Sequence, residues 1–290
     1  LPGYPIEPKR VSCEARGKPL PVYSEKDLDE LMDPDYVINF HWKVDRSLSY
    51  THQLLFEVEH NVHLPAPLWE WLTHTNVKRF VNISTTKVFS HLNQNPISSR
   101  SEPRPLSPYG IGKLIAEKFF DAMFFESICP VVHLRLCSIA SPGEHQSHLM
   151  SQLYTSAYEN RQITINNGHL CTIIYIDEAV DLIINAALIA DSPQYIIATA
   201  PVDTRQIVSR FETLSKKKIK ACYIDLQPGT VDPLFESDSE QLRSYWTRST
   251  SLDRAIQNYI AANNNSATRL FVPMDPRQNY MREGYNAKSS

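Results

Sequence analysis

Residues 78–90 read KRFVNISTTKVFS and residues 107–118 read SPYGIGKLIAEK, and these two stretches decide the fold. The first is a continuous apolar run that leads into hydroxyl residues, which is typical of a buried strand. The second predicts an amphipathic helix over 109–126, and the apolar run PVVHLRL at 130–136 predicts the next strand. Strand, helix and strand in this order indicate a parallel pair with a crossover helix.

The same alternation extends over the rest of the chain. The run YVINF at 36–40 predicts a strand, and residues 51–74 predict a helix. Continuous apolar strands separated by helices predict an α/β fold, in which a mostly parallel sheet carries helices on both faces. The carboxyl ends of such strands meet at one edge of the sheet, where open α/β sheets bind ligands. Beyond residue 140 we expect a strand and then a helix within 162–190, helices at 204–215 and 251–262, and a strand at 221–226.

Composition excludes several classes of protein. The 290 residues are 42% apolar and 21% charged, which is ordinary for a globular protein. A net charge of −3 gives no general drive toward nucleic acid or an anionic membrane. No apolar run reaches the roughly 18 residues that span a bilayer, so we expect no membrane insertion. The first residues, LPGYPIEPKR, do not resemble a signal peptide.

Cysteine and histidine usage favours a reducing environment without a metal site. The five cysteines are odd in number, widely scattered and never paired as CxxC. We therefore expect buried free thiols in an intracellular compartment such as the cytoplasm or an organelle matrix. The ten histidines have no Cys or acidic neighbours at ligand spacing, so we expect no bound metal.

Tyr109 and Lys113 stand four residues apart, so a helix places them on one face. An ammonium beside a phenol favours the phenolate and lowers the tyrosine pKa toward values useful for proton transfer. Thr85 ends the strand before this helix, where its hydroxyl can orient a substrate oxygen. The alternative is purely structural: Tyr109 packs and caps the helix, and Thr85 is a β-branched residue that suits a strand end.

Six motifs in order resemble the extended short-chain dehydrogenase/reductase family, which holds the NAD-dependent sugar-nucleotide epimerases, dehydratases and reductases. With the segment RSYWTRSTSLDRAIQNYI, which is similar to the family's closing helix, the resemblance extends over about residues 23–262. The matching segments are DLDELMDPDYVINF, the pair Asn61-Val62, KRFVNISTTKVFS, SPYGIGKLIAEK, HLRLCSIASPG and TIIYIDEAVDLIINAAL.

The resemblance implies a Rossmann-like fold and an oxidoreductase-type site. The implied catalytic residues are Thr85, Tyr109 and Lys113. The implied cofactor contacts are Asn61, Ser84, Tyr109 and Lys113, and the implied substrate contacts are Thr86 and Ser138. The cofactor would be NAD or NADP, and the substrate a nucleotide sugar.

Several positions depart from the family's pattern. No G-x-x-G-x-x-G motif occurs in these 290 residues. The first βαβ unit, which seats the pyrophosphate in the family, therefore either precedes residue 1 or is missing or degenerate in the protein. His41 and Trp42 replace two small residues of the family, and a tryptophan would occupy room that the cofactor needs. Cys171 stands where the family's arginine meets the nucleotide diphosphate, and Ser138 replaces a substrate-contacting asparagine. We therefore expect NAD(H) and NADP(H) to bind weakly or not at all.

The expected organisation has four parts. They are an N-terminal arm (1–22), a Rossmann-like domain (23–200), a small substrate-type lobe (201–262) and an extended tail (263–290). Two functions stay open. One is a sugar-nucleotide epimerase, dehydratase or reductase. The other is a non-catalytic subunit, a pseudoenzyme held in a larger assembly by its arm and tail. We expect a homodimer or a subunit of a larger complex, and no nucleic-acid partner.

Overall fold

The computed structural model describes residues 34–63, 65–125, 129–225, 232–244, 247 and 249–265. Within this part of the chain the main sheet has four parallel strands in the order β1-β2-β3-β8. Their bounds are β1 Tyr36–Asn39, β2 Arg79–Thr85, β3 Val131–Leu136 and β8 Gln194–Ile197. The strands expected near 36–40, 79–84 and 131–136 are confirmed, and so is the α/β class.

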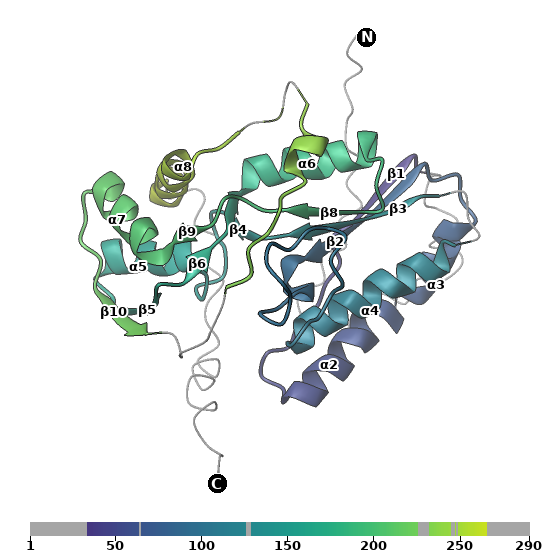
Figure 1. Cartoon of the computed structure of the whole chain (residues 1–290), viewed down its shortest axis with the longest axis horizontal. Helices are drawn as coiled ribbons and strands as arrows, with labels where there is room; N and C mark the ends of the chain where they lie inside the picture. The colour runs from purple at the N-terminus through teal and green to yellow at the C-terminus, as the bar shows by residue number, and fades with distance from the viewer. Residues whose placement is uncertain are drawn as a thin grey trace. The chain divides into compact units, whose positions relative to one another are not determined.

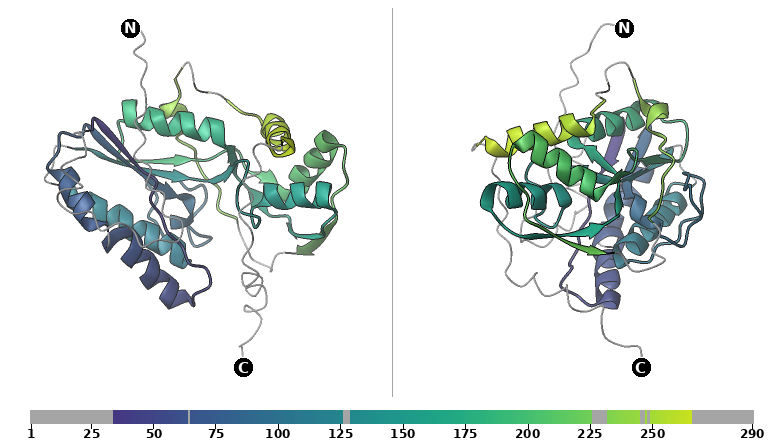
Figure 2. Two further views of the ribbon diagram at one scale, coloured as in Figure 1. Left: turned by 180° about the vertical axis from the view of Figure 1, so that it is seen from behind. Right: turned by 60° about the vertical axis from the view of Figure 1, so that its left-hand side comes forward.

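Helices cover both faces of this sheet (Figure 1). One face carries α2 (Tyr50–Val58), α3 (Ala66–Thr73) and α4 (Pro108–Met123), and the other carries α6 (Ile176–Ile189). Alternation along β2 explains this arrangement, because side chains of neighbouring strand residues point to opposite faces. Phe80 packs with Phe120 of α4, whereas Val81 packs in a separate cluster with Leu182 of α6. Figure 2 shows from behind that α2 and α4 lie side by side.

The helix expected over 51–74 is interrupted. The α-helical turns of α2 give way to a π-helical segment, Glu59–His63, before α3 begins at Ala66. Pro65 lies at the break and has no backbone N–H to donate to a preceding turn. The helix expected at 109–126 is confirmed as α4, with Ser107 as its N-cap and Pro108 in its first turn.

A chain of buried polar side chains crosses the sheet in register. Asn39 Nδ2 donates to Asn82 Oδ1 at 3.1 Å, and Asn82 Nδ2 lies 3.2 Å from His133 Nδ1. His133 Nε2 lies 2.9 Å from Asp121 Oδ1 on α4. The asparagines are paired neighbours on β1 and β2, and His133 is the neighbour of Asn82 on β3. A slip of one residue would separate these partners, so the network specifies the strand register.

A second apolar cluster organises the later part of the chain. It packs α5 (Leu149–Glu159), α7 (Thr204–Ser215) and α8 (Leu252–Asn264) around β5 (Ile163–Asn167), which pairs in parallel with β10 (Ala221–Asp225). The elements expected at 204–215, 221–226 and 251–262 are therefore present. The cluster contains residues from before and after position 200, where the sequence-based boundary of the small lobe lies. Helix α5 and strand β5 therefore pack with the elements of the expected lobe at 201–262. The remaining short strands are β4 (Ser138–Ala140), β6 (Leu170–Cys171), β7 (Ile173–Tyr175) and β9 (Val202–Asp203).

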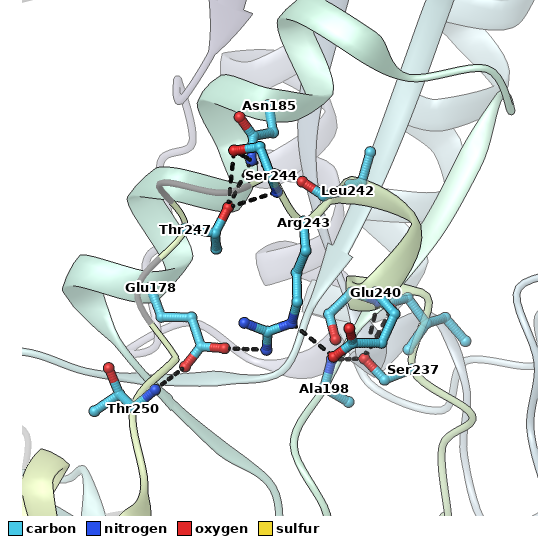
Figure 3. Close-up of polar contacts among 12 residues, drawn as sticks. Glu178, Asn185, Ala198, Ser237, Glu240, Leu242, Arg243, Ser244, Thr247 and Thr250 are labelled. Carbon is cyan, nitrogen blue, oxygen red and sulfur yellow. Dashed lines mark hydrogen bonds and ion pairs between the residues drawn. The ribbon is translucent and has the colours of Figure 1, made fainter.

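The segment from Ser239 onward is tied to α6 by polar contacts (Figure 3). The 3₁₀ turn Ser239–Leu242 places its last carbonyl 2.7 Å from Asn185 Nδ2, and the same amide donates to Thr247 Oγ1 at 2.9 Å. Glu178 binds the guanidinium of Arg243 and accepts a hydrogen bond from the Thr250 amide at 3.0 Å. Because Asn185 and Glu178 are both buried, these bonds hold the segment against the outer side of α6.

Three further expectations concern cysteines, metals and membranes. Cys129 and Cys137 are buried free thiols, Cys171 is half-buried and Cys222 is exposed, while Cys13 lies outside the described residues. Cys222 therefore departs from the expectation. Over the described ranges, no group of three or more metal-binding side chains is found. In the same ranges, no helix has both the length and the apolar character to cross a membrane.

Candidate active site

The end of β2 and the start of α4 meet through a glycine. Thr85 ends β2, and its Oγ1 accepts a hydrogen bond from the Lys87 amide at 3.2 Å at the start of a 3₁₀ turn, Thr86–Val88. A Cβ on Gly110 would lie 2.2 Å from the Lys87 carbonyl oxygen, which no side chain tolerates. Glycine thus permits α4 to approach this turn closely, and the approach brings Tyr109 to Thr85.

Tyr109 and Thr85 interact through their side chains. Burial raises the pKa of Tyr109, a hydrogen bond with Thr85 lowers it, the Glu57 carboxylate raises it and Arg46 lowers it. The net direction is upward, so the phenol stays protonated at neutral pH. The sequence-based expectation of a lowered Tyr109 pKa is therefore wrong, and Lys113 is not among the groups that shift this pKa. The ammonium of Lys113 lies 6.0 Å from the Tyr109 ring centroid and is turned to other partners.

Lys113 is enclosed. Its side chain is buried, and Nζ donates to the Ile83 carbonyl at 2.8 Å. The ring of Trp42 covers the ammonium, with 4.0 Å between Nζ and the ring centroid. Burial lowers the pKa of Lys113 to about 7, against the opposing charges of Glu117 and Glu57. At neutral pH this amine is therefore only partly protonated.

Glu57 and Trp42 complete the cluster. The edge of the Trp42 ring meets Tyr109, with centroids 6.2 Å apart and planes at 84°. Glu57 is fully buried on α2, and its Oε1 accepts a hydrogen bond from Gln53 Nε2 at 2.8 Å. Burial raises the pKa of Glu57, while Gln53, the Trp42 indole and the cations Lys113 and Arg46 lower it. A buried carboxyl group and a buried amine thus lie beside a half-buried indole and a half-buried phenol.

The segment that carries Trp42 is fixed on both sides. Asn61 accepts a hydrogen bond from the Lys43 amide and donates to the Lys43 carbonyl at 2.8 Å. The imidazole Nε2 of His41 lies 3.0 Å from the His60 carbonyl, and the His41 amide donates to Asn39 at 2.9 Å. Asn61, expected as a cofactor contact, holds the backbone next to Trp42.

The other expected site residues lie in different surroundings. Ser84 donates to Glu117, whose carboxylate forms a two-point pair with Arg135 at 2.8 and 3.2 Å. Ser84 thus belongs to a buried network between the sheet and α4. Thr86 is buried in the 3₁₀ turn, and Ser138 is exposed at the start of β4.

Sequence reasoning missed Glu57 and the pair of Glu117 with Arg135. Glu57 is flanked by apolar residues in LLFEVEH, a pattern that signals a helix but does not show which acidic residue faces inward. Glu117 lies four residues after Lys113, a spacing that predicts a shared helix face and could have indicated it.

Residues 15–198, more than half of the chain, match the NAD dependent epimerase/dehydratase family. The chain belongs to this family. The assignment confirms the resemblance drawn from the ordered motifs of the sequence. Among the family's proteins, "Uncharacterized UDP-glucose epimerase YtcB" of Bacillus subtilis (strain 168) is 25% identical over 212 residues. That alignment covers 70% of this chain and 66% of the relative, just under two thirds of its length.

Solved structures share the fold. The UDP-glucuronic acid 4-epimerase of Bacillus cereus, in complex with UDP-glucuronic acid and NAD, matches with a TM-score of 0.67 and 23% identity. The match covers 82% of this chain and 79% of that one. RMD from Pseudomonas aeruginosa, complexed with NADPH, matches with a TM-score of 0.69 and 13% identity, over 81% and 84% of the two chains. At these identities the likeness establishes the fold alone.

Proposed function

We propose that this chain is a family member that does not hold a nicotinamide dinucleotide at Lys113 and serves as a non-catalytic subunit of a larger assembly. The observation that carries the proposal is the enclosure of Lys113. The residue is 5% exposed, and its ammonium is bonded to the Ile83 carbonyl and lies under the Trp42 ring. The relatives in complex with NAD and NADPH make that cofactor the expected ligand of the fold, so the question is whether these residues fit it.

The fit fails at the nicotinamide end. The family resemblance assigns Lys113 to the cofactor, and a ribose hydroxyl would have to reach Nζ. An indole at 4.0 Å occupies one side of the amine, and one of its hydrogen bonds goes to the Ile83 carbonyl, so a ribose hydroxyl would compete with both. The backbone that carries Trp42 is held in place, because Asn61 binds both backbone groups of the next residue, Lys43. No chemical step is therefore derived through the cofactor.

The anionic part of a ligand also lacks its expected partner. Cys171 stands where the family carries an arginine, and burial raises the pKa of this thiol to about 11. A neutral thiol offers neither the charge nor the paired donors that a guanidinium gives to a diphosphate. The loss of this cation supports the inference that nucleotide sugars bind weakly.

The residual chemistry of the site is hydrogen bonding. Tyr109 is a protonated phenol that interacts with Thr85, and the raised pKa disfavours the phenolate that would accept a proton. The pair can donate a hydrogen bond to a hydroxyl or carbonyl group. It is therefore suited to holding a polar group in place rather than to moving its proton.

A second candidate function is conversion of a nucleotide sugar, with Tyr109 as general acid/base and Thr85 orienting the substrate. The contact between Thr85 and Tyr109 favours it. The names of the relatives suggest UDP-glucose and UDP-glucuronic acid as the substrates to test.

An assay of turnover separates the two candidates. The purified chain is incubated with each UDP-sugar and NAD, and the sugars are analysed by NMR. The matched control is Tyr109→Phe, which keeps the ring and removes the hydroxyl. We expect the same absence of product for both proteins. Product formed by the wild-type chain and lost in the variant would support the enzyme and contradict the proposal.

A further inference from the structure

Two buried polar atoms beside Lys113 have no hydrogen-bond partner. They are Nε1 of Trp42 and Oε2 of Glu57. The indole is near enough to lower the carboxyl pKa, although the two atoms do not meet hydrogen-bond geometry. A small shift would let one satisfy the other, because the indole N–H is a donor and the carboxylate oxygen an acceptor. The structure thus places a carboxylate where it can fix the orientation of the indole.

The space around this pair is filled from three sides. A Cβ on Gly112 would lie 3.0 Å from Glu57 Oε2 and 3.4 Å from Trp42 Cζ2, so α4 carries a glycine where the two side chains press against it. Gln53 holds the other carboxylate oxygen of Glu57 at 2.8 Å. Lys113 closes the third side, with its ammonium against the face of the indole.

We propose that Trp42 is the residue that excludes the nicotinamide end of a dinucleotide, and that Glu57 is a positioning residue that holds the indole over Lys113. The inference rests on the proposed function and names the side chains responsible for it. Without Glu57 the indole would lose this acceptor, and Lys113 would lose one of the two carboxylates that favour its charged form. The cover over Lys113 would then open, even though Trp42 itself is unchanged.

The experiment measures how fast each lysine is modified. The intact chain is treated briefly with a reductive methylation reagent at mildly alkaline pH, and the peptides are quantified by mass spectrometry. Lys118 lies on the same helix with its side chain 69% exposed, and serves as the internal reference in every sample. The variants are Trp42→Ala, Glu57→Ala and the conservative controls Trp42→Phe and Glu57→Gln.

In the wild-type chain we expect Lys113 to be modified at least about tenfold more slowly than Lys118, because modification requires local opening. Trp42→Ala and Glu57→Ala should each remove most of this protection. Trp42→Phe retains a ring over the amine and Glu57→Gln retains an acceptor, so both should keep it. Circular dichroism shows which variants fold, and Trp42→Leu replaces Trp42→Ala if the latter does not.

Two results would overturn the inference. One is a folded Trp42→Ala or Trp42→Leu protein in which Lys113 stays protected, because the indole would then not be the cover. The other is full protection in Glu57→Ala, which would remove the positioning role of Glu57. Neither result depends on cofactor binding. A wild-type chain that binds NADH would instead contradict the proposed function, so the two failures are distinguishable.

Discussion

At the scale of single residues, the surroundings of Lys113 decide the chemistry of the site. The sequence placed Tyr109 and Lys113 on one helix face and Thr85 at a strand end, and these positions follow from spacing alone. The direction of the shift in the Tyr109 pKa does not follow from spacing. It depends on burial and on Glu57, which lies more than 50 residues earlier in the chain. Local spacing fixes which residues share a face, but charges from another helix set their protonation.

The lowered pKa of Lys113 predicts a pH dependence of stability. An unfolded lysine keeps its proton up to about pH 10.5, whereas folded Lys113 loses it near 7. Between these values the unfolded state binds more protons, so the free energy of unfolding should rise with pH. The upper limit of this contribution is about 1.4 kcal/mol per pH unit.

Lys113→Met removes the titrating group and keeps an unbranched apolar side chain. Urea unfolding at several pH values between neutral and alkaline should show a stability difference, wild type minus variant, that grows with pH. Titrating groups that do not interact with Lys113 cancel in this difference. A difference independent of pH would show that Lys113 is not desolvated in the folded protein.

At the scale of secondary-structure elements, α4 was predictable from the sequence. The helical region at 51–74 was predictable only in part. A serine cap, a proline in the first turn and apolar residues at helical spacing define α4 without tertiary information. The same apolar pattern over 51–74 concealed a break at Pro65, where a π-helical segment separates α2 from α3. The proline is visible in the sequence. The π-helical turn is not, because it places Asn61 against the backbone of Lys43, which is a tertiary contact.

Gly110→Ala tests the close approach of α4 to the end of β2. Its Cβ would lie 2.2 Å from a backbone oxygen, so the helix start has to move away from Lys87. We expect a loss of about 2–3 kcal/mol in the free energy of unfolding, as for overpacking in a core. Ile115→Ala is the matched control, because Ile115 is exposed on the same helix and its loss should change stability by under about 0.5 kcal/mol. Equal stabilities for the two variants would contradict the described contact.

At the scale of the whole chain, the second apolar cluster and its connection to the sheet were the least predictable features. The sequence indicated its helices, yet not that α5 and β5 pack with α7 and α8, because these contacts join residues far apart in sequence. The contacts of Asn185 and Glu178 on α6 are of the same kind. Neither residue is distinguished in the sequence from the exposed polar residues of other helices.

Asn185→Ala should loosen the segment that α6 holds. The change leaves the Leu242 carbonyl and the Thr247 hydroxyl without their buried donor. A loss of about 1–3 kcal/mol is expected in urea unfolding. Gln241→Ala, at an exposed position of the same segment, is the control and should be near neutral. A neutral Asn185→Ala would mean that these bonds do not hold the segment.

Isothermal titration of the purified chain with NADH and NADPH tests the central claim most directly. Because Trp42 covers Lys113, we predict no saturable heat, corresponding to a Kd weaker than about 1 mM. Low-micromolar binding of either dinucleotide would require the ammonium of Lys113 to be open to a ligand, and it would contradict this account.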